Sequence, residues 1–187
     1  MLNELIPELK NRGVNFVKVV DISMLSVKEN RGYNVANELS EWTADFIEEK
    51  GYNAYAQSER NLINGFFDVD TKTTTLPHKK IAMLAGLGWI GKSNLLVTEE
   101  YGSALCMCSV LTNAPLPTQN KMIIMPKCAE CTVCRDICPT KVIHGSTWEI
   151  GMNRDLIVDV YNCETCLKCL SNCPWTQRYM KISGGLT

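Results

Sequence analysis

Cysteine is the residue type with the clearest chemical meaning in this sequence. All ten cysteines lie in the second half of the chain, and eight of them form two runs with one spacing, C-x2-C-x2-C-x3-C-P. The runs are Cys128, Cys131, Cys134 and Cys138, followed by Cys163, Cys166, Cys169 and Cys173. Thiolates at this spacing wrap a loop around the iron atoms of a cubane, so the pattern predicts two [4Fe–4S] clusters.

The fourth cysteine of each run is expected to serve the other cluster. It follows on a helical turn and points away from its own loop, as in bacterial two-cluster ferredoxins. The first predicted ligand set is Cys128, Cys131, Cys134 and Cys173, and the second is Cys163, Cys166, Cys169 and Cys138. Crossed ligation predicts two neighbouring clusters in one compact lobe whose folding depends on bound iron.

Zinc sites and disulfides are the alternatives for these eight cysteines. Zinc is often held by two CxxC pairs, whereas this chain repeats a run of four cysteines followed by proline. The N-terminal residues MLNELIPELKNRG lack the pattern of a signal peptide, and no apolar run reaches the about 20 residues needed to span a bilayer. We therefore predict a cytoplasmic, reducing location, where disulfides are rare.

Three further residues have roles that the sequence leaves open. Cys106 and Cys108 lie two apart in an apparent strand and would share one face. Buried small hydrophobes are the favoured interpretation, and a redox or ligand role is the alternative. For His78, a surface position at a helix start is favoured over a group that titrates near neutrality. No catalytic residue is assigned.

The composition is that of an ordinary globular protein, with 45% hydrophobic and 21% charged residues. The formal net charge of −1 gives no reason to expect a nucleic-acid or anionic-membrane surface. Helical and strand patterns are mixed, which predicts an α+β fold: a small α/β layer domain over residues 1–120, then a ferredoxin-like domain over residues 121–187 with two clusters.

The expected elements follow from apolar periodicity and from glycine and proline stops. Helices are predicted over residues 2–10, 35–50 and 77–85, with a helical stretch over 154–160. Strands are predicted over residues 14–20, 52–56, 95–97 and 104–111, with a turn at Tyr101–Gly102.

A glycine-rich turn lies in KIAMLAGLGWIGKSNLLV, residues Lys80–Val97. Gly86, Gly88 and Gly91 match a dinucleotide fingerprint, and GLGWIGKS matches a phosphate-loop string. Both motifs require a strand before the loop, and here a helix is expected there. Trp89 and Ile90 are also bulky for a backbone cradle. Nucleotide binding is therefore not the favoured interpretation.

The order of motifs resembles another family. AGLGWIGK, the Gly102-Ser103 turn and a double cysteine run ending in Cys173-Pro174-Trp175 resemble epoxyqueuosine reductases and, more distantly, corrinoid-dependent reductive dehalogenases. The resemblance covers roughly residues 76–178. It implies a nitroreductase-like α/β domain that binds cobalamin, with the clusters delivering electrons to cobalt.

The resemblance also implies which residues lie near that cofactor, namely Gly86, Gly88, Trp89, Gly91 and Lys92. A tight packing turn is the alternative for these five residues. The chain departs from the family in being much shorter, with no C-terminal repeat domain. Asp68 and Asp70 stand out of register with the family's acidic proton donor, so the queuosine reaction is not transferred.

The sequence thus predicts an iron–sulfur redox protein. Electrons would come from a reduced ferredoxin- or flavodoxin-like donor and pass through two clusters to a corrinoid or a flavin. One alternative is a pure ferredoxin-type electron carrier, or a redox subunit with no second cofactor. Another is a homo-oligomer in which a second chain completes the cofactor site.

Overall fold

The computed structural model describes residues 1–14, 17–18, 37–58, 67–74, 77–118 and 122–183. The chain forms two compact units. The first comprises Met1–Ile81 and Cys106–Lys121, and the second comprises Ala82–Leu105 and Met122–Thr187. Residues 82–105, which contain the glycine-rich turn, thus pack with the cysteine runs, although they precede the domain boundary predicted between residues 120 and 121.

Two amphipathic helices begin the first unit. Helix α1 (Leu2–Asn11) buries Leu5 and Leu9, and α2 (Asn37–Glu48) buries Ile47 among other residues of one face. Residues three or four apart share a helix face, which is why these side chains reach the core together. The helices predicted over residues 2–10 and 35–50 are confirmed.

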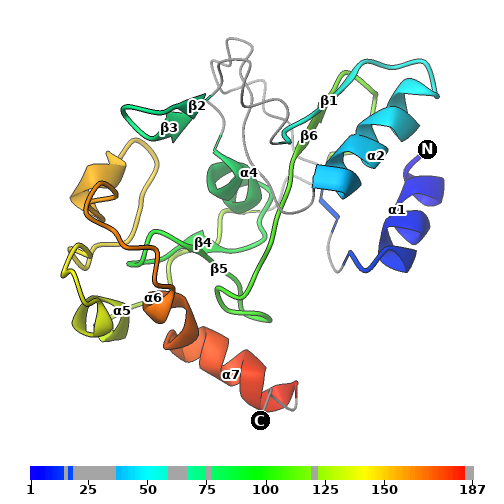
Figure 1. Ribbon diagram of the computed structural model, residues 1–187. Coiled ribbons are helices and arrows are strands. Elements are labelled where there is room, and N and C mark those ends of the chain that lie inside the picture. Colours follow the sequence, from blue (N-terminus) through cyan, green and yellow to red (C-terminus); the bar gives the residue numbers. More distant parts are fainter. Residues whose placement is uncertain (15–16, 19–36, 59–66, 75–76, 119–121, 184–187) are drawn as a thin grey trace. The chain divides into compact units, whose positions relative to one another are not determined.

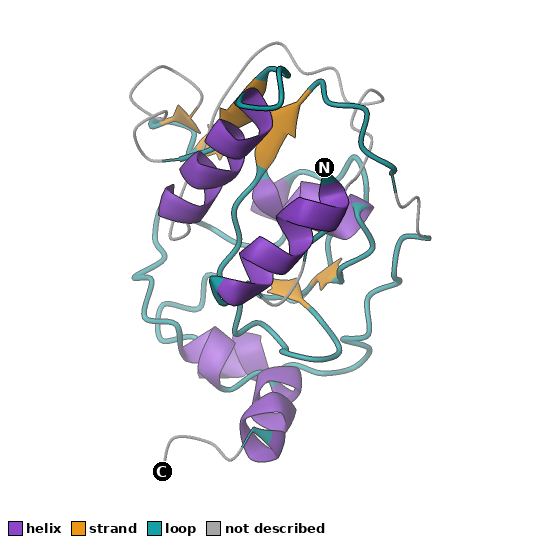
Figure 2. Cartoon of the chain, turned by 90° about the vertical axis from the view of Figure 1, so that its right-hand side faces the viewer, coloured by secondary structure: helices purple, strands orange, loops and turns teal. Residues whose placement is uncertain are grey.

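Two short strands complete the core of this unit. Strand β1 (Ala54–Ala56) pairs antiparallel with β6 (Val110–Thr112), and α2 packs against both strands (Figures 1 and 2). A separate hairpin joins β2 (Phe67–Asp68) to β3 (Thr73–Thr74). The strand predicted over residues 52–56 is confirmed. Most of the strand predicted over residues 14–20 lies outside the described residues.

The strand predicted over residues 104–111 is wrong for most of its length. Only Val110–Thr112 forms β6, and Ala104–Ser109 runs without strand pairing. The apolar residues of this segment predicted a strand, but a strand needs a partner, and β1 pairs only as far as Ala56, opposite Val110. Cys106 and Cys108 therefore lie in a loop.

The second unit begins in helix α4 (His78–Leu84), which continues from the first unit along the chain. Its further elements are the hairpin strands β4 (Trp89–Ile90) and β5 (Leu96–Val97), the helices α5 (Val133–Ile137), α6 (Lys168–Ser171) and α7 (Pro174–Ile182), and the short 3-10 helix η1 (Arg154–Leu156). Helix α6 packs against both α5 and α7. Only η1 forms in the helical stretch predicted over residues 154–160.

A small apolar cluster lies among the cysteine-bearing segments. Val142, Ile143 and Val158 are buried together with Cys138, and a β-bridge joins Ile143 to Val158. Cys134 and Cys169 pack against this cluster as partly buried residues. The cluster brings the two cysteine runs together around one core.

The mixed helix and strand class predicted from sequence is confirmed. Among the described residues, the strands pair in three separate two-stranded antiparallel sheets, and no helix there is long and apolar enough to cross a bilayer. The nitroreductase-like layering and the ferredoxin-like form of the second unit remain predictions.

Candidate metal centre

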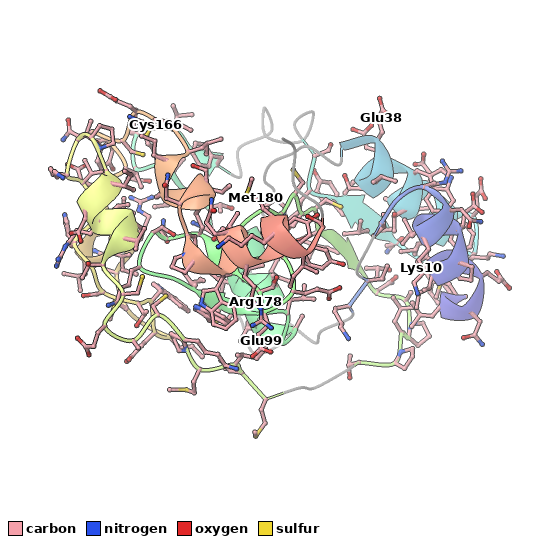
Figure 3. All side chains as sticks on the ribbon, turned by 90° about the horizontal axis from the view of Figure 1, so that it is seen from below. Lys10, Glu38, Glu99, Cys166, Arg178 and Met180 are labelled. Carbon is pink, nitrogen blue, oxygen red and sulfur yellow. The ribbon has the colours of Figure 1, made fainter. Side chains whose placement is uncertain are left out.

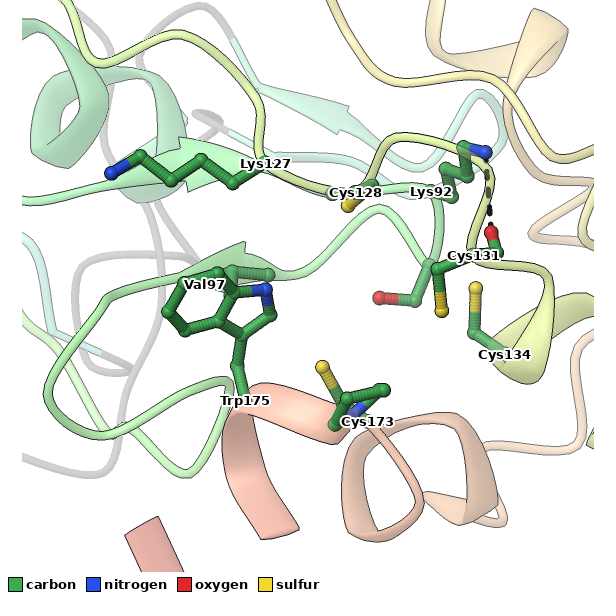
Figure 4. A pocket seen from close by; sticks show the side chains of 11 residues that line it. Lys92, Val97, Lys127, Cys128, Cys131, Cys134, Cys173 and Trp175 are labelled. Carbon is green, nitrogen blue, oxygen red and sulfur yellow. Dashed lines mark hydrogen bonds between the residues drawn. The ribbon is translucent and has the colours of Figure 1, made fainter. Parts of the chain in front are cut away.

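Four cysteines from the two runs line one cavity in the second unit. The cavity has a volume of about 300 Å³ (Figure 4). Cys128, Cys131 and Cys134 approach it from the first run, and Cys173 enters from the start of α7 (Figure 4). The remaining lining residues are Gly91, Lys92, Ser93, Val97, Lys127, Pro174 and Trp175. These four thiols are the first ligand set predicted from the spacing.

Local structure explains how the fourth cysteine leaves its own run. Cys173 is the N-cap of α7, and Pro174 occupies the first helical turn, where its fixed φ suits a helix start. Cys138 likewise ends α5, adopts an extended conformation and is buried in the apolar cluster. Both fourth cysteines thus lie at helix ends, where the chain changes direction.

The other run is more exposed. Cys163 and Cys166 are exposed, while Cys169 is half-buried on the apolar cluster that also contains Cys138. Burial is the largest cause of the raised pKa of Cys169. The neighbouring Cys163 and Cys166 raise it further by charge repulsion. The cluster links Cys138 with the half-buried end of the second run.

The surroundings of Cys134 and Cys138 shift the pKa values of these two thiols in opposite directions. Burial raises the pKa of Cys134 to about 11, so the neutral thiol is favoured near pH 7 in the absence of a cation. At Cys138, burial also raises the pKa, but hydrogen bonds from the Thr140 hydroxyl and from backbone N–H groups outweigh it and leave the pKa lowered. Coordination to a metal deprotonates thiols outright.

The donor set fits a polynuclear cluster better than a single ion. Zn–S bonds of about 2.3 Å in a tetrahedron bring sulfur atoms to about 3.8 Å from one another. Within the described ranges, no three cysteine, histidine or carboxylate side chains converge closely enough to hold one metal ion. Four thiols around a cavity of about 300 Å³ instead leave room for a larger inorganic core. None of the ten cysteines forms a disulfide.

The glycine-rich turn forms one wall of this cavity. Gly91, Lys92 and Ser93, which line the cavity, connect β4 to β5, where Trp89 pairs with Val97. A Cβ atom on Gly88 would lie 2.0 Å from the Val97 carbonyl oxygen, and one on Gly91 would lie 2.9 Å from Val97 Cγ2 and 3.4 Å from Cys128 Sγ. Close packing therefore requires glycine at position 88 and favours it at position 91, which agrees with the alternative interpretation that the sequence left open.

Trp89 and Lys92 also make contacts within the second unit. Trp89 is 0% exposed and packs edge-to-face on Trp175, with ring centroids 5.2 Å apart. The Lys92 ammonium donates hydrogen bonds to the backbone carbonyls of Ala129 and Cys131. Gly86 has a positive φ of 68° just after α4, a conformation that glycine adopts without strain.

The turn does not have the geometry of a nucleotide-binding loop. Both fingerprints require a strand before the glycines and a helix after them. Here α4 precedes Gly86 and Gly88, and Gly91 lies within the β4–β5 hairpin. The sequence match to these motifs therefore does not identify a phosphate site.

A charged group borders the cavity near Trp175. Lys127 forms an ion pair with Glu99, and its ammonium lowers the pKa of Glu99. Arg178 lies beside Glu99 (Figure 3) and 6.0 Å from the centre of the Trp175 ring. The charge of Lys127 is thus compensated, whereas the Lys92 ammonium donates to two neutral backbone carbonyls.

The residues with open roles lie in the first unit. Cys106 is exposed, so its interpretation as a buried hydrophobe is wrong, while burial raises the pKa of the Cys108 thiol. His78 begins α4 as predicted, but it is half-buried and its Nδ1 lies 2.8 Å from Ser109 Oγ. The Asp68 carboxylate accepts the Thr71 N–H, which lowers its pKa, in an exposed turn.

Sequence reasoning missed two contacts of Thr176, which follows the cavity residue Trp175 in α7. Thr176, buried directly after Trp175, accepts a hydrogen bond of 2.9 Å from the Ser103 backbone N–H. Gly102 lies against Thr176, where a Cβ atom would come within 2.2 Å of the Thr176 nitrogen. The Gly102-Ser103 pair was noticed in the sequence, but nothing there connected it with α7, because the contact spans 73 residues.

The chain resembles known proteins in sequence over part of its length. No model of a known protein family matches the chain. An epoxyqueuosine reductase of Bacillus anthracis is 36% identical over 129 residues, covering 58% of this chain and 33% of the relative. One of Prochlorococcus marinus (strain NATL2A) is 26% identical over 188 residues, covering 90% of this chain and 60% of the relative. The chain therefore spans only part of the length of these curated relatives.

Solved structures of epoxyqueuosine reductases have a fold similar to that of this chain. The epoxyqueuosine reductase of Streptococcus thermophilus has a TM-score of 0.53 and 20% identity, covering 87% of this chain and 46% of that one. An epoxyqueuosine reductase solved with a tRNA stem loop has a TM-score of 0.54 and 18% identity, covering 80% and 42%. At such identities the likeness concerns the fold. The predicted resemblance is confirmed: in sequence and in fold, this chain is similar to epoxyqueuosine reductases over part of their length.

Proposed function

We propose that this chain is an iron–sulfur redox protein whose two [4Fe–4S] clusters deliver electrons to a corrinoid or flavin acceptor, as an epoxyqueuosine reductase-like oxidoreductase. The observation that carries the proposal is the convergence of Cys128, Cys131, Cys134 and Cys173 on one cavity. When bound, such clusters take up and release single electrons. The second set would be Cys163, Cys166, Cys169 and Cys138.

The two cysteine runs would have different tasks because they differ in exposure. Cys163 and Cys166 are exposed, so their loop can meet a donor protein, which we propose to be a reduced ferredoxin or flavodoxin. Cys128 and Cys131 are half-buried and line a cavity together with Trp175. Exclusion of water and local charge are the means by which a protein adjusts cluster potential.

Iron analysis tests this proposal. Protein purified without oxygen is expected to contain about eight iron atoms and about eight acid-labile sulfides per chain, because two cubanes contain that number. Colorimetric iron and sulfide determination, with electron paramagnetic resonance after reduction by dithionite, makes the measurement. Protein in which Cys106 and Cys108 are both replaced by Ala is the control and should keep the full content. Two zinc atoms with no iron or sulfide would refute the proposal.

The acceptor part of the proposal depends on likeness to the relatives. The turn residues Gly88, Trp89, Gly91 and Lys92 are accounted for by packing and by hydrogen bonds to the first cysteine run. They do not themselves form an open cradle for a macrocycle, so no step through a corrinoid is derived. The same observation favours the second candidate, a ferredoxin-type carrier or redox subunit with no further cofactor.

Cobalamin binding separates the two candidates. Under the acceptor proposal, iron-loaded protein is expected to retain added cobalamin in anaerobic equilibrium dialysis and to change its visible spectrum. Flavin mononucleotide, dialysed in parallel, covers the flavin alternative. Retention of neither compound by fully loaded protein would favour the carrier. A solution mass measured in the same samples shows whether retention accompanies formation of a homo-oligomer.

The substrate class remains part of the proposal. One relative was solved with an epoxyqueuosine-modified tRNA stem loop, which makes a modified tRNA base the substrate class to consider for this chain. The formal net charge of −1 supplies no general attraction for RNA. Any RNA contact would therefore depend on a local surface rather than on overall charge.

A further inference from the structure

Lys92 is the residue of the glycine-rich turn whose arrangement is not explained by packing alone. Its ammonium nitrogen lies 2.5 Å from the Ala129 carbonyl oxygen and 3.1 Å from the Cys131 carbonyl oxygen, and it lines the same cavity as the four thiols (Figure 4). Both carbonyls belong to the loop of the first cysteine run. A hydrogen bond from a charged donor is about twice as strong as one between neutral groups.

The turn itself delivers Lys92 to this position. The Gly91 N–H donates to the Leu95 carbonyl at 2.9 Å, and the Asn94 N–H donates to the Gly91 carbonyl at 2.9 Å. These bonds close a tight loop, in which Asn94 takes a positive φ of 58°. The backbone of Gly91 also lies against the Cys128 thiol, because a Cβ atom there would be 3.4 Å from Cys128 Sγ. The hairpin tip and the cysteine loop are therefore in direct contact.

The loop that Lys92 holds has an uncommon backbone. Ala129 has a positive φ of 39°, a conformation that costs free energy for any residue with a Cβ atom. Thr165, two residues after Cys163 in the second run, also has a positive φ, of 51°. Lys92 thus bonds to the carbonyl of Ala129, the residue with the uncommon backbone, and to that of Cys131.

We propose, on the basis of the proposed function, that Lys92 is a positioning residue. It holds the Cys128–Cys131 loop and raises the reduction potential of the cluster at that loop. Reduction adds one electron to the cluster and makes it more negative, and a fixed ammonium stabilises the more negative state. Charge and hydrogen bonding are among the factors that set cluster potential. Half-burial of this run opposes reduction, and Lys92 offsets that effect.

Three variants separate charge from hydrogen bonding. Lys92→Gln keeps an N–H donor but removes the charge, Lys92→Met removes both, and Lys92→Arg keeps both. Lys127→Met is the matched control, because Lys127 lines the same cavity but its charge is paired with Glu99. Each protein is purified without oxygen and titrated with dithionite, with the two cluster signals followed by electron paramagnetic resonance.

Lys92→Gln and Lys92→Met are each expected to make the reduction of one cluster at least about tenfold less favourable, which is about 59 mV for one electron. The other cluster should be unaffected, Lys92→Arg should resemble the parent protein, and Lys127→Met should shift less than Lys92→Met. Full iron content with unchanged potentials in Lys92→Gln and Lys92→Met would overturn the inference alone. Loss of half the iron in Lys92→Met, together with a shifted potential in Lys92→Gln, would show that Lys92 both holds the loop and raises the reduction potential. Parent protein without [4Fe–4S] signals would overturn the proposed function, and the inference with it.

Discussion

Replacing Cys128 and Cys173 together by Ala is expected to leave about half of the iron, whereas replacing Cys128 and Cys138 together is expected to remove nearly all of it. Each pair removes one loop cysteine and one fourth cysteine, so the two variants are matched. The cavity groups Cys128 with Cys173, so the first pair damages one cluster only. Under crossed ligation the second pair damages both, because each [4Fe–4S] cluster needs four thiolates. Iron and sulfide content of anaerobically purified protein is the measurement.

The reverse pattern would show that each run holds its own cluster. Loss of all iron from both variants would mean that the lobe does not fold with one cluster, and a second measurement then decides. Serine at the same positions supplies an oxygen ligand and can retain an altered cluster. In Cys128→Ser with Cys173→Ser, crossed ligation predicts one altered and one normal electron paramagnetic resonance signal. Two altered signals in that variant would contradict it.

Trp89→Ala is expected to destabilise the protein by about 3–5 kcal/mol, the usual cost of truncating a buried aromatic side chain to alanine. Trp89 is 0% exposed and forms an edge-to-face contact with Trp175, which lines the cavity. Such a loss is a large part of the roughly 5–15 kcal/mol that stabilises a typical domain. Anaerobic guanidinium unfolding followed by circular dichroism measures the change in free energy of unfolding.

The control for this substitution is Trp42→Ala. Trp42 is half-buried on α2, where it stacks on Phe46 and lies 4.2 Å below the Arg12 guanidinium, so less apolar surface is lost on truncation. Trp89→Ala should also lower the iron content, because Trp175 loses its support, while Trp42→Ala should not. An equal loss of stability in the two variants would contradict the role given to Trp89.

The structure also changes how the glycine-rich turn is understood. The resemblance to epoxyqueuosine reductases suggested that these residues lie near a cofactor, and the geometry gives each of them a packing or hydrogen-bonding task in the second unit. Gly88 and Gly91 allow β5 and the Cys128 loop to approach closely. A corrinoid or flavin site therefore remains a proposal that binding measurements must test.

Local patterns were sufficient for several elements of the fold. Helices α1 and α2 were predicted within two residues at each end, because apolar periodicity and the following glycines act over a single turn of chain. The strand predicted over residues 104–111 was mostly wrong, since strand formation depends on a distant partner. Cys106 was misinterpreted for the same reason: without a strand, its expected burial was not realised.

By itself, the sequence determined which side chains can bind metal and in what order, because the repeated cysteine spacing is a local property of the chain. The tertiary structure brings Cys173 to one cavity with Cys128, Cys131 and Cys134, as the spacing predicts, and it alone decided that Lys92 bonds to the loop of the first run. These contacts connect segments that are 37 or more residues apart. Their formation depends on how α7 and the β4–β5 hairpin pack against the first cysteine run, and no local pattern records that packing.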